Sequence, residues 1–161
     1  MTTLDSSFTG VLCPIVTPFS DGEVDKEVLS SLTDFILGNG VDGLFPCGTT
    51  GEFASLAPTE RQTVIETVCD AAGAAPVIAG VAGTSVPETL TRIEEAEAVG
   101  ADAAAIVGPY FHTANDPAGS HRFFERIAEG ASLPLYFYNI PMYVGDGIGA
   151  ETVGHFQNTI P

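Results

Sequence analysis

The stretch LFPCGTTGEFASL, residues 44–56, is the part of the sequence that decides the fold. An apolar run ends at Cys47, and Gly48 and Gly51 then bracket two threonines. A buried strand followed by a glycine-hinged turn is typical of the link between a strand and a helix. Such a turn can aim backbone N–H groups and threonine hydroxyls at a small carboxylate, although an ordinary strand-to-helix turn also fits this pattern alone.

The same alternation of an apolar run with a helical period occurs five times along the chain. Each apolar run is hydrophobic almost throughout, which is typical of parallel strands that are covered on both faces. The runs predict strands at residues 10–16, 43–47, 76–81, 101–107 and 133–139.

The segments between these runs predict helices. The second helix begins near Pro58, and the third begins at Ser85 with Glu88 at capping-box spacing. The fourth begins near residues 116–117, and a shorter fifth begins near Glu151. The first helix is expected to bury one apolar face, made of Val28, Leu29, Leu32, Phe35 and Ile36.

The chain is therefore predicted to be an α/β protein with a strand about every 30 residues, which is the size of a βα unit. Two architectures fit: an open doubly wound sheet, or about the first five units of a (β/α)8 barrel. A dinucleotide-binding fingerprint would favour the open sheet. The GVAGTS segment after the third strand lacks the spacing of that fingerprint, and both architectures stay open on these patterns alone.

The charge balance excludes some classes of function. The 161 residues include 21 acidic side chains and only 5 basic ones, with Lys26 as the single lysine. Nucleic-acid binding is disfavoured because it depends on clustered Lys and Arg. Acidic residues dispersed over predicted helices suggest a halophilic protein, and the polar N-terminus without a long apolar run suggests a cytoplasmic one. The three cysteines fit no zinc-binding spacing and are interpreted as buried thiols.

Polar and aromatic residues follow the predicted strands, where both architectures place function. TPF, GTTGE, GTS, PYFH and YNIP follow or end the five strands in turn. Tyr138, in YNIP, is either a core aromatic or a proton shuttle that faces the rim. Tyr110 and Phe111 have the same two interpretations, whereas His112 is interpreted as a loop histidine.

Taken together, these motifs make the chain resemble one family. TPF (residues 17–19), GTTGE (48–52), ER (60–61), GPYF (108–111) and YNIP (138–141) occur in order. In combination they resemble the N-terminal part of the dihydrodipicolinate synthase / N-acetylneuraminate lyase family of class I pyruvate aldolases. The resemblance implies a (β/α)8 barrel that forms or cleaves a C–C bond between pyruvate and an aldehyde.

The resemblance also implies the roles of individual residues. A lysine of the family forms a Schiff base with the keto carbon of pyruvate. Thr49 and Thr50 would hold the pyruvate carboxylate, with Gly51 and Tyr110 completing the substrate site. Tyr138 would relay protons with the help of the Thr50 hydroxyl. No metal and no cofactor are expected, and a homo-oligomer is expected for the full-length form.

Two departures from the family pattern bear on the substrate. Dihydrodipicolinate synthases carry a second tyrosine where this chain has Phe111, and an arginine where it has Tyr143. Because a phenol cannot replace a guanidinium in a bidentate carboxylate clamp, a 2-keto-3-deoxy sugar acid is favoured as the substrate. The alternatives are 4-hydroxy-tetrahydrodipicolinate synthase, a non-catalytic keto-acid-binding or assembly domain, and an open-sheet binding protein.

The resemblance places the Schiff-base lysine on a sixth strand, shortly after the segment that matches ETVGHFQNTIP. We therefore expect residues 1–161 to be the N-terminal portion of a single barrel domain, truncated before that strand. Lys26 lies on the first predicted helix, and an arginine cannot act as the amine nucleophile. This chain alone is accordingly expected to be inactive in Schiff-base chemistry.

Overall fold

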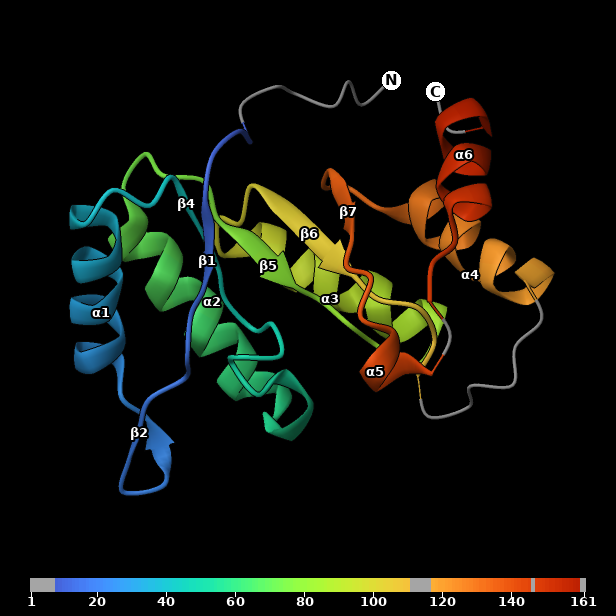
Figure 1. Cartoon of the computed structure of the whole chain (residues 1–161). Coiled ribbons are helices and arrows are strands. Elements are labelled where there is room, and N and C mark those ends of the chain that lie inside the picture. The colour runs from blue at the N-terminus through green and yellow to red at the C-terminus, as the bar shows by residue number, and fades with distance from the viewer. Residues whose placement is uncertain (1–7, 111–116, 146, 160–161) are drawn as a thin grey trace.

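A computed structural model of the chain describes residues 8–110, 117–145 and 147–159. Within these ranges, strands and helices alternate as the sequence predicts (Figure 1). Each strand of the main sheet falls inside one of the five predicted runs. These strands are β1 (Leu12–Pro14), β4 (Gly43–Phe45), β5 (Ile78–Gly80), β6 (Ala103–Ile106) and β7 (Leu135–Phe137).

The strands of the main sheet are parallel and pair in the order in which they occur. β1 pairs with β4, β5 with β6, and β6 with β7. An isolated parallel bridge between Leu44 and Val77 links β4 to β5. The order β1-β4-β5-β6-β7 has none of the reversal that defines a doubly wound sheet. The chain therefore forms part of a (β/α) barrel, and the barrel interpretation of the sequence is confirmed.

Helices follow the strands near the predicted positions. α2 opens at Pro58, as predicted, and buries Val64, Ile65 and Val68. The Ser85 side chain accepts a hydrogen bond from the Glu88 backbone N–H at 3.3 Å, as an N-cap residue does. The helices that precede or follow these strands are α1 (Lys26–Gly38), α2 (Pro58–Ala72), α3 (Val86–Ala98), α4 (Pro117–Gly130) and α6 (Ala150–Thr159).

The predicted apolar face of α1 is wrong in part. Leu29 is fully buried, but Val28 is 50% exposed and Phe35 is 66% exposed. The buried stripe instead continues through Thr33, whose hydroxyl donates to the backbone carbonyl of Leu29 at 3.0 Å. Because that bond satisfies the hydroxyl within the helix, a threonine can occupy a core position that the hydrophobic pattern does not reveal.

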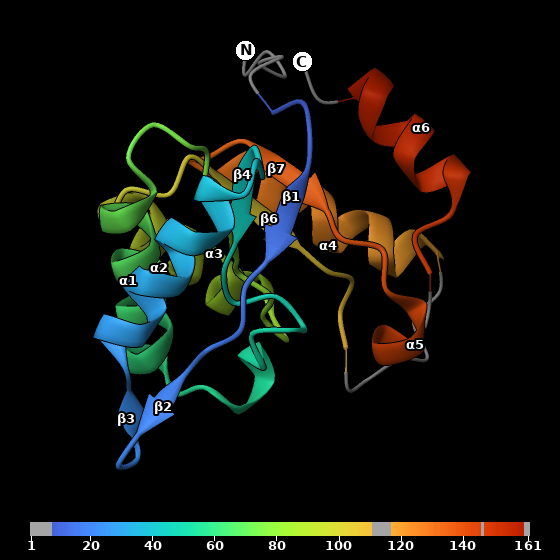
Figure 2. The same ribbon diagram turned by 60° about the vertical axis from the view of Figure 1, so that its left-hand side comes forward.

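Four short elements were not predicted. β2 (Phe19–Ser20) and β3 (Glu23–Val24) form an antiparallel hairpin that projects beyond α1 (Figure 2). Its turn residues Asp21 and Gly22 both have positive φ angles, the geometry that an Asp-Gly pair favours, so the sequence did carry this signal. A 3₁₀ turn, η1 (Phe53–Ser55), and a one-turn helix, α5 (Pro141–Val144), lie after β4 and β7.

The sheet has two differently covered faces. Ala79, Ala104 and Ile106 belong to the main core, together with buried residues of the helices. Ile78 and Ala103 belong to a smaller cluster on the other face, where aromatic side chains are only partly buried. Within the described ranges, no helix combines the length and the apolar character that crossing a membrane requires. The carboxyl ends of the strands meet at the end of the sheet where α5 lies, and this end carries the candidate site.

Candidate active site

The turn after β4 is shaped by strained residues at its two ends. Cys47 and Glu52 have φ angles of 55° and 57°, which non-glycine residues seldom adopt. Gly48 and Gly51 lie between them, and neither has a positive φ angle. The sequence interpretation of these glycines as hinges is therefore incomplete, because the left-handed positions belong to their neighbours.

The glycines around this turn allow neighbouring backbone segments to lie in close contact. A Cβ atom on Gly51 would lie 3.0 Å from the backbone carbonyl oxygen of Ile15. A Cβ atom on Gly80, in β5, would lie only 2.0 Å from the backbone oxygen of Cys47. The Gly80 N–H also donates to the carbonyl of Pro46 at 2.9 Å. β5 therefore fixes the height of the turn above the sheet, and only glycine fits at position 80.

One pair of hydroxyls joins this turn to the end of β7. The Thr49 hydroxyl and the Tyr138 phenol lie 3.3 Å apart, and either can be the donor. Thr50, which the sequence analysis paired with Tyr138, is exposed and forms no hydrogen bond with it in the described structure. The structure thus brings the first threonine of the turn to the phenol and leaves the second at the surface, and the role expected for Thr50 stays a prediction.

Tyr138 has a packed ring and a hydrogen-bonded hydroxyl, and its role as a proton shuttle stays a prediction. Its ring packs edge-on against Phe45 at a centroid distance of 5.4 Å, within the smaller cluster that contains Ile78 and Ala103. Its backbone N–H donates to the carbonyl of Ile106 at 2.8 Å, which extends the pairing of β7 with β6. The ring is thus a core aromatic, while its hydroxyl reaches the rim through Thr49.

Sequence reasoning assigned no role to Thr17, although the TPF motif contains it. The Thr17 hydroxyl donates to the backbone carbonyl of Gly51 at 2.8 Å. This bond ties the segment after β1 to the turn after β4. Thr17 therefore holds the turn in place from the neighbouring strand end, and only its position in the motif could have indicated this.

A pocket of about 250 Å³ opens beside the Thr49–Tyr138 pair. Thr49 and Tyr110 belong to its lining, so two of the predicted substrate-binding residues share one cavity. Glu52 is the charged residue of the described lining. The remaining wall is mainly apolar and comes from η1, the end of β6 and α5. Its residues are Phe53, Ala54, Ser55, Val107, Ile140, Tyr143 and Val144.

The structure describes only one of the two residues that depart from the family pattern. Tyr143 lies on α5, is 62% exposed and lines the pocket, so it is placed where it can meet a substrate. Phe111 and His112 lie outside the described residues. Within the described ranges, no group of three His, Cys, Asp or Glu side chains is arranged to hold a metal ion.

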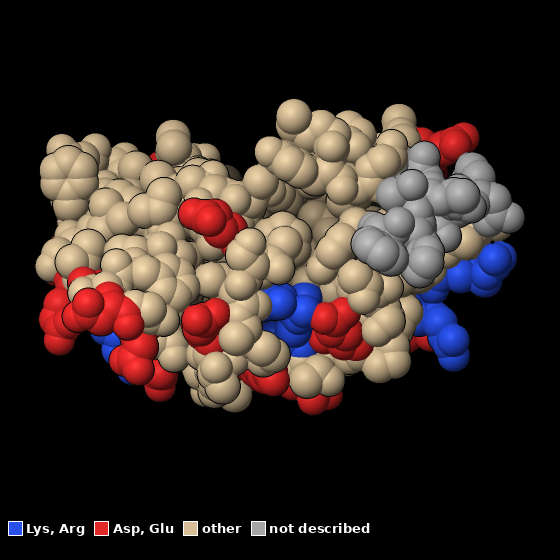
Figure 3. Space-filling view, turned by 90° about the horizontal axis from the view of Figure 1, so that it is seen from below, with Lys and Arg blue, Asp and Glu red and all other residues tan. Residues whose placement is uncertain are grey.

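Seen from the side on which α5 lies, acidic side chains occupy much of one margin of the molecule (Figure 3). Basic side chains form one patch between acidic groups and another near one end (Figure 3).

Cys47 lies at the start of the turn after β4, and burial raises the pKa of its thiol to about 12 despite the nearby charges of Arg61 and Arg92. Its thiol is therefore a neutral core group rather than a nucleophile.

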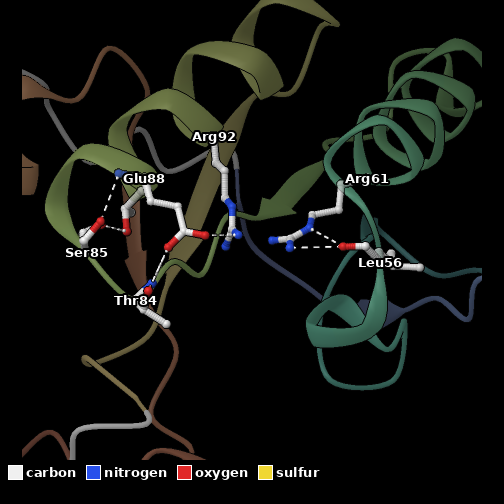
Figure 4. Close-up of polar contacts among 7 residues, drawn as sticks. Leu56, Arg61, Thr84, Ser85, Glu88 and Arg92 are labelled. Carbon is white, nitrogen blue, oxygen red and sulfur yellow. Dashed lines mark hydrogen bonds and ion pairs between the residues drawn. The ribbon is translucent and has the colours of Figure 1, made fainter.

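Arg61 and Arg92 point toward one another from α2 and α3 (Figure 4). Arg61 donates through Nε and Nη2 to the carbonyl of Leu56, at 3.2 and 3.1 Å, while Arg92 forms an ion pair with Glu88. The Nη1 atoms of both arginines are buried without a hydrogen-bond partner. Burial, followed by the charge of Arg92, lowers the pKa of Arg61.

Glu88 is the anion that offsets these two charges. Its carboxylate accepts from the backbone N–H of Thr84 at 2.7 Å and from the Thr84 hydroxyl at 3.0 Å. Burial alone would raise the pKa of Glu88, but these hydrogen bonds and the charges of Arg92 and Arg61 outweigh it and lower the pKa. The side chain therefore bonds to Thr84 instead of the Ser85 N–H that a complete capping box would use.

Comparison with known proteins gives one consistent result. The family model described as "Dihydrodipicolinate synthetase family" matches residues 7–161. A relative from Syntrophus aciditrophicus (strain SB), named 4-hydroxy-tetrahydrodipicolinate synthase, is 40% identical over 147 residues, which are 91% of this chain and 50% of the relative. The chain thus spans about half the length of the curated relatives it matches.

Solved structures agree with this result. Dihydrodipicolinate synthase from Aquifex aeolicus superposes with a TM-score of 0.89 at 35% identity, covering 94% of this chain and 52% of that one. YagE, a prophage protein of the dihydrodipicolinic acid synthase family from E. coli K12, was solved in complex with pyruvate. It gives a TM-score of 0.89 at 33% identity, covering 94% of this chain and 51% of that one.

Proposed function

Because the chain belongs to the dihydrodipicolinate synthetase family, we propose that it carries the keto-acid-binding part of a class I lyase. In this proposal, the turn after β4 holds the carboxylate of pyruvate through Thr49, Thr50 and the backbone at Gly51. Tyr138 relays protons, and Tyr110 forms part of the wall that the substrate meets. The amine that forms the Schiff base would come from a lysine supplied by a following strand.

The hydroxyl pair of Thr49 and Tyr138 is the observation that carries this proposal. The two hydroxyls lie 3.3 Å apart at the rim of the sheet and come from strand ends separated by β5 and β6. A hydrogen-bonded phenol can pass a proton to and from a substrate that sits beside it. Thr49 also lines the pocket, so it connects the phenol with the space that a substrate would occupy.

The leading reaction is that of a 4-hydroxy-tetrahydrodipicolinate synthase, which joins pyruvate to aspartate semialdehyde. The relatives that carry this name support it better than they support our preference from sequence for a 2-keto-3-deoxy sugar acid. The sugar-acid reaction remains the second candidate because Tyr143 lines the pocket where a carboxylate clamp is expected. The carboxylate of Glu52, in the same lining, would also repel a second anionic group on the aldehyde substrate.

Pyruvate binding by this chain is the first test. We expect titration calorimetry to detect binding that Thr49→Val and Tyr138→Phe weaken. Thr67→Val is the matched control, because the Thr67 hydroxyl donates to the Thr63 carbonyl within α2 and does not line the pocket. Failure of the unmodified chain to bind pyruvate, or equal losses in Thr49→Val and Thr67→Val, would overturn the proposal.

A chimera decides between the two reactions. Residues 1–161 are joined to the remaining half of the Syntrophus relative, and turnover of pyruvate is measured with aspartate semialdehyde and with glyceraldehyde. Preference for aspartate semialdehyde supports the leading reaction, and preference for glyceraldehyde supports the second. Tyr143→Arg is expected to shift the ratio toward aspartate semialdehyde, since an arginine can pair with its carboxylate. Pyruvate binding without turnover of either aldehyde would favour a non-catalytic keto-acid-binding domain.

A further inference from the structure

The side chain of Asn139 bonds to both backbone groups of a single distant residue. Its Oδ1 accepts from the N–H of Ile148 at 2.9 Å, and its Nδ2 donates to the carbonyl of Ile148 at 3.2 Å. An amide that pairs in this way takes the place of a backbone peptide group, at a position just after the end of β7. It closes the segment between residues 139 and 148 into a loop.

That loop contains α5, which cannot hold its own position. A helix of four residues is too short to be stable by itself, so its place depends on what surrounds it. α5 has no side-chain cap at Ile140 and ends at Gly145, which has a φ angle of 81°. The contact that fixes it on the sheet side is Val144, which is 4% exposed and packs with Ala82 and Val107.

The closed loop forms one wall of the pocket beside the hydroxyl pair. Ile140, Tyr143 and Val144 all line the pocket, and each lies between the two ends that the Asn139 amide joins. Tyr138 packs in the same cluster as Val144 and Ile140, directly before Asn139 in the chain. α5 lies beyond the end of β7 in two views of the molecule (Figures 1 and 2).

We propose that Asn139 is a positioning residue for the keto-acid site. Its amide closes the loop that holds α5 against the end of the sheet, and it thereby sets the pocket wall beside Thr49 and Tyr138. This inference rests on the proposed function, because the wall matters for binding only if a keto acid occupies the pocket. It also accounts for an asparagine directly after the tyrosine, since only a side chain with both a donor and an acceptor can pair with both groups of Ile148.

The test compares Asn139→Ala and Asn139→Asp with the unmodified 161-residue chain. Hydrogen–deuterium exchange across residues 140–148 reports the loop, and calorimetry reports the dissociation constant for pyruvate. We expect Asn139→Ala to accelerate exchange in this segment and to raise the dissociation constant roughly fivefold, the size expected for losing about one net hydrogen bond. Asn139→Asp keeps the acceptor for the Ile148 N–H. Its exchange rate and its dissociation constant are expected to lie between those of the unmodified chain and those of Asn139→Ala.

Two controls separate positioning from general stability. Asn39→Ala removes an amide that donates to the Phe35 carbonyl at 2.7 Å at the end of α1, and it should change neither measurement. Ile93→Val, in the buried core of α3, should lower the melting temperature without changing the dissociation constant. If Ile93→Val raises the dissociation constant as much as an Asn139 variant does at an equal loss of melting temperature, the weaker binding reflects general stability and the positioning role is overturned.

The remaining outcomes are also decisive. Pyruvate binding that is unchanged in Asn139→Ala overturns the positioning role while leaving the proposed function intact. A lack of binding by the unmodified chain overturns the proposed function instead. Unchanged exchange at residues 140–148 in Asn139→Ala shows that the amide does not hold the loop, whatever the binding result.

Discussion

Replacing Gly80 by alanine should displace the turn after β4 as a unit. The new Cβ atom would lie 2.0 Å from the oxygen and 2.6 Å from the carbon of the Cys47 carbonyl group. Atoms in normal contact lie roughly 3.5 Å apart, so the strand and the turn would have to separate by more than about 1 Å. Both partners are backbone, and no side-chain rotation can relieve the clash.

The expected cost lies at the upper end of what overpacking causes, about 3 kcal/mol of unfolding free energy. For a chain of this length, that corresponds to a fall in melting temperature of about 6–12 °C. Thr49 lies within the displaced turn, so its hydrogen bond with Tyr138 should be lost and pyruvate binding with it. Differential scanning calorimetry and pyruvate titration measure the two effects separately.

Gly38→Ala is the matched control. A Cβ atom on this glycine meets nothing within 4 Å, and the residue is the last of α1. Alanine there should raise stability by up to about 0.5–1 kcal/mol, because it restricts the unfolded chain. The reasoning fails if Gly80→Ala melts within a degree of the unmodified chain and still binds pyruvate.

Three further predictions concern charge and chemistry. The lowered pKa of Glu88 contributes stability that is present above the pKa of an unfolded glutamate, about 4.3, and is lost as the pH falls through the folded value. The stability advantage of the unmodified chain over Glu88→Gln in urea unfolding should therefore shrink below about pH 4, and a constant difference would contradict the assignment. With a net charge of −16, the melting temperature should rise with potassium chloride, and a salt-independent value would count against a halophilic protein. Borohydride trapping with pyruvate should leave Lys26 unmodified, because this exposed lysine begins α1, away from the hydroxyl pair; peptide mapping that finds a pyruvyl group on Lys26 would refute this.

The strands and most helices were predictable because their signals are local and repeated. Continuous apolar runs indicate buried parallel strands, Pro58 marks a helix start through its fixed φ angle, and Ser85 marks one through its capping side chain. The α1 face was misjudged because Thr33 satisfies its hydroxyl internally, which no hydrophobic pattern reveals. The hairpin at Asp21 and Gly22 was missed although its turn signal is present.

The candidate site was predictable as a place but not in its details. Strand ends and motifs indicated the turn after β4 and the tyrosine after β7. That Thr49 and not Thr50 contacts Tyr138 is a matter of the backbone conformation of the turn, whose end residues Cys47 and Glu52 have positive φ angles that the residue types do not predict. The contacts of Thr17 with Gly51 and of Asn139 with Ile148 join residues far apart in sequence, and single-sequence patterns do not contain such pairs.

The order of the main sheet has a consequence for how the chain is made. Each strand pairs with the strand of the next unit, so every new βα unit finds its partner already synthesised. Pairing between successive units keeps the sequence separation of strand contacts smaller than a rearranged strand order would, and folding slows as that separation grows. During synthesis, units can dock on the emerging polypeptide one after another from the N-terminus. In the order β1-β4-β5-β6-β7, each strand from β4 onward can then pair with an edge strand that was synthesised before it.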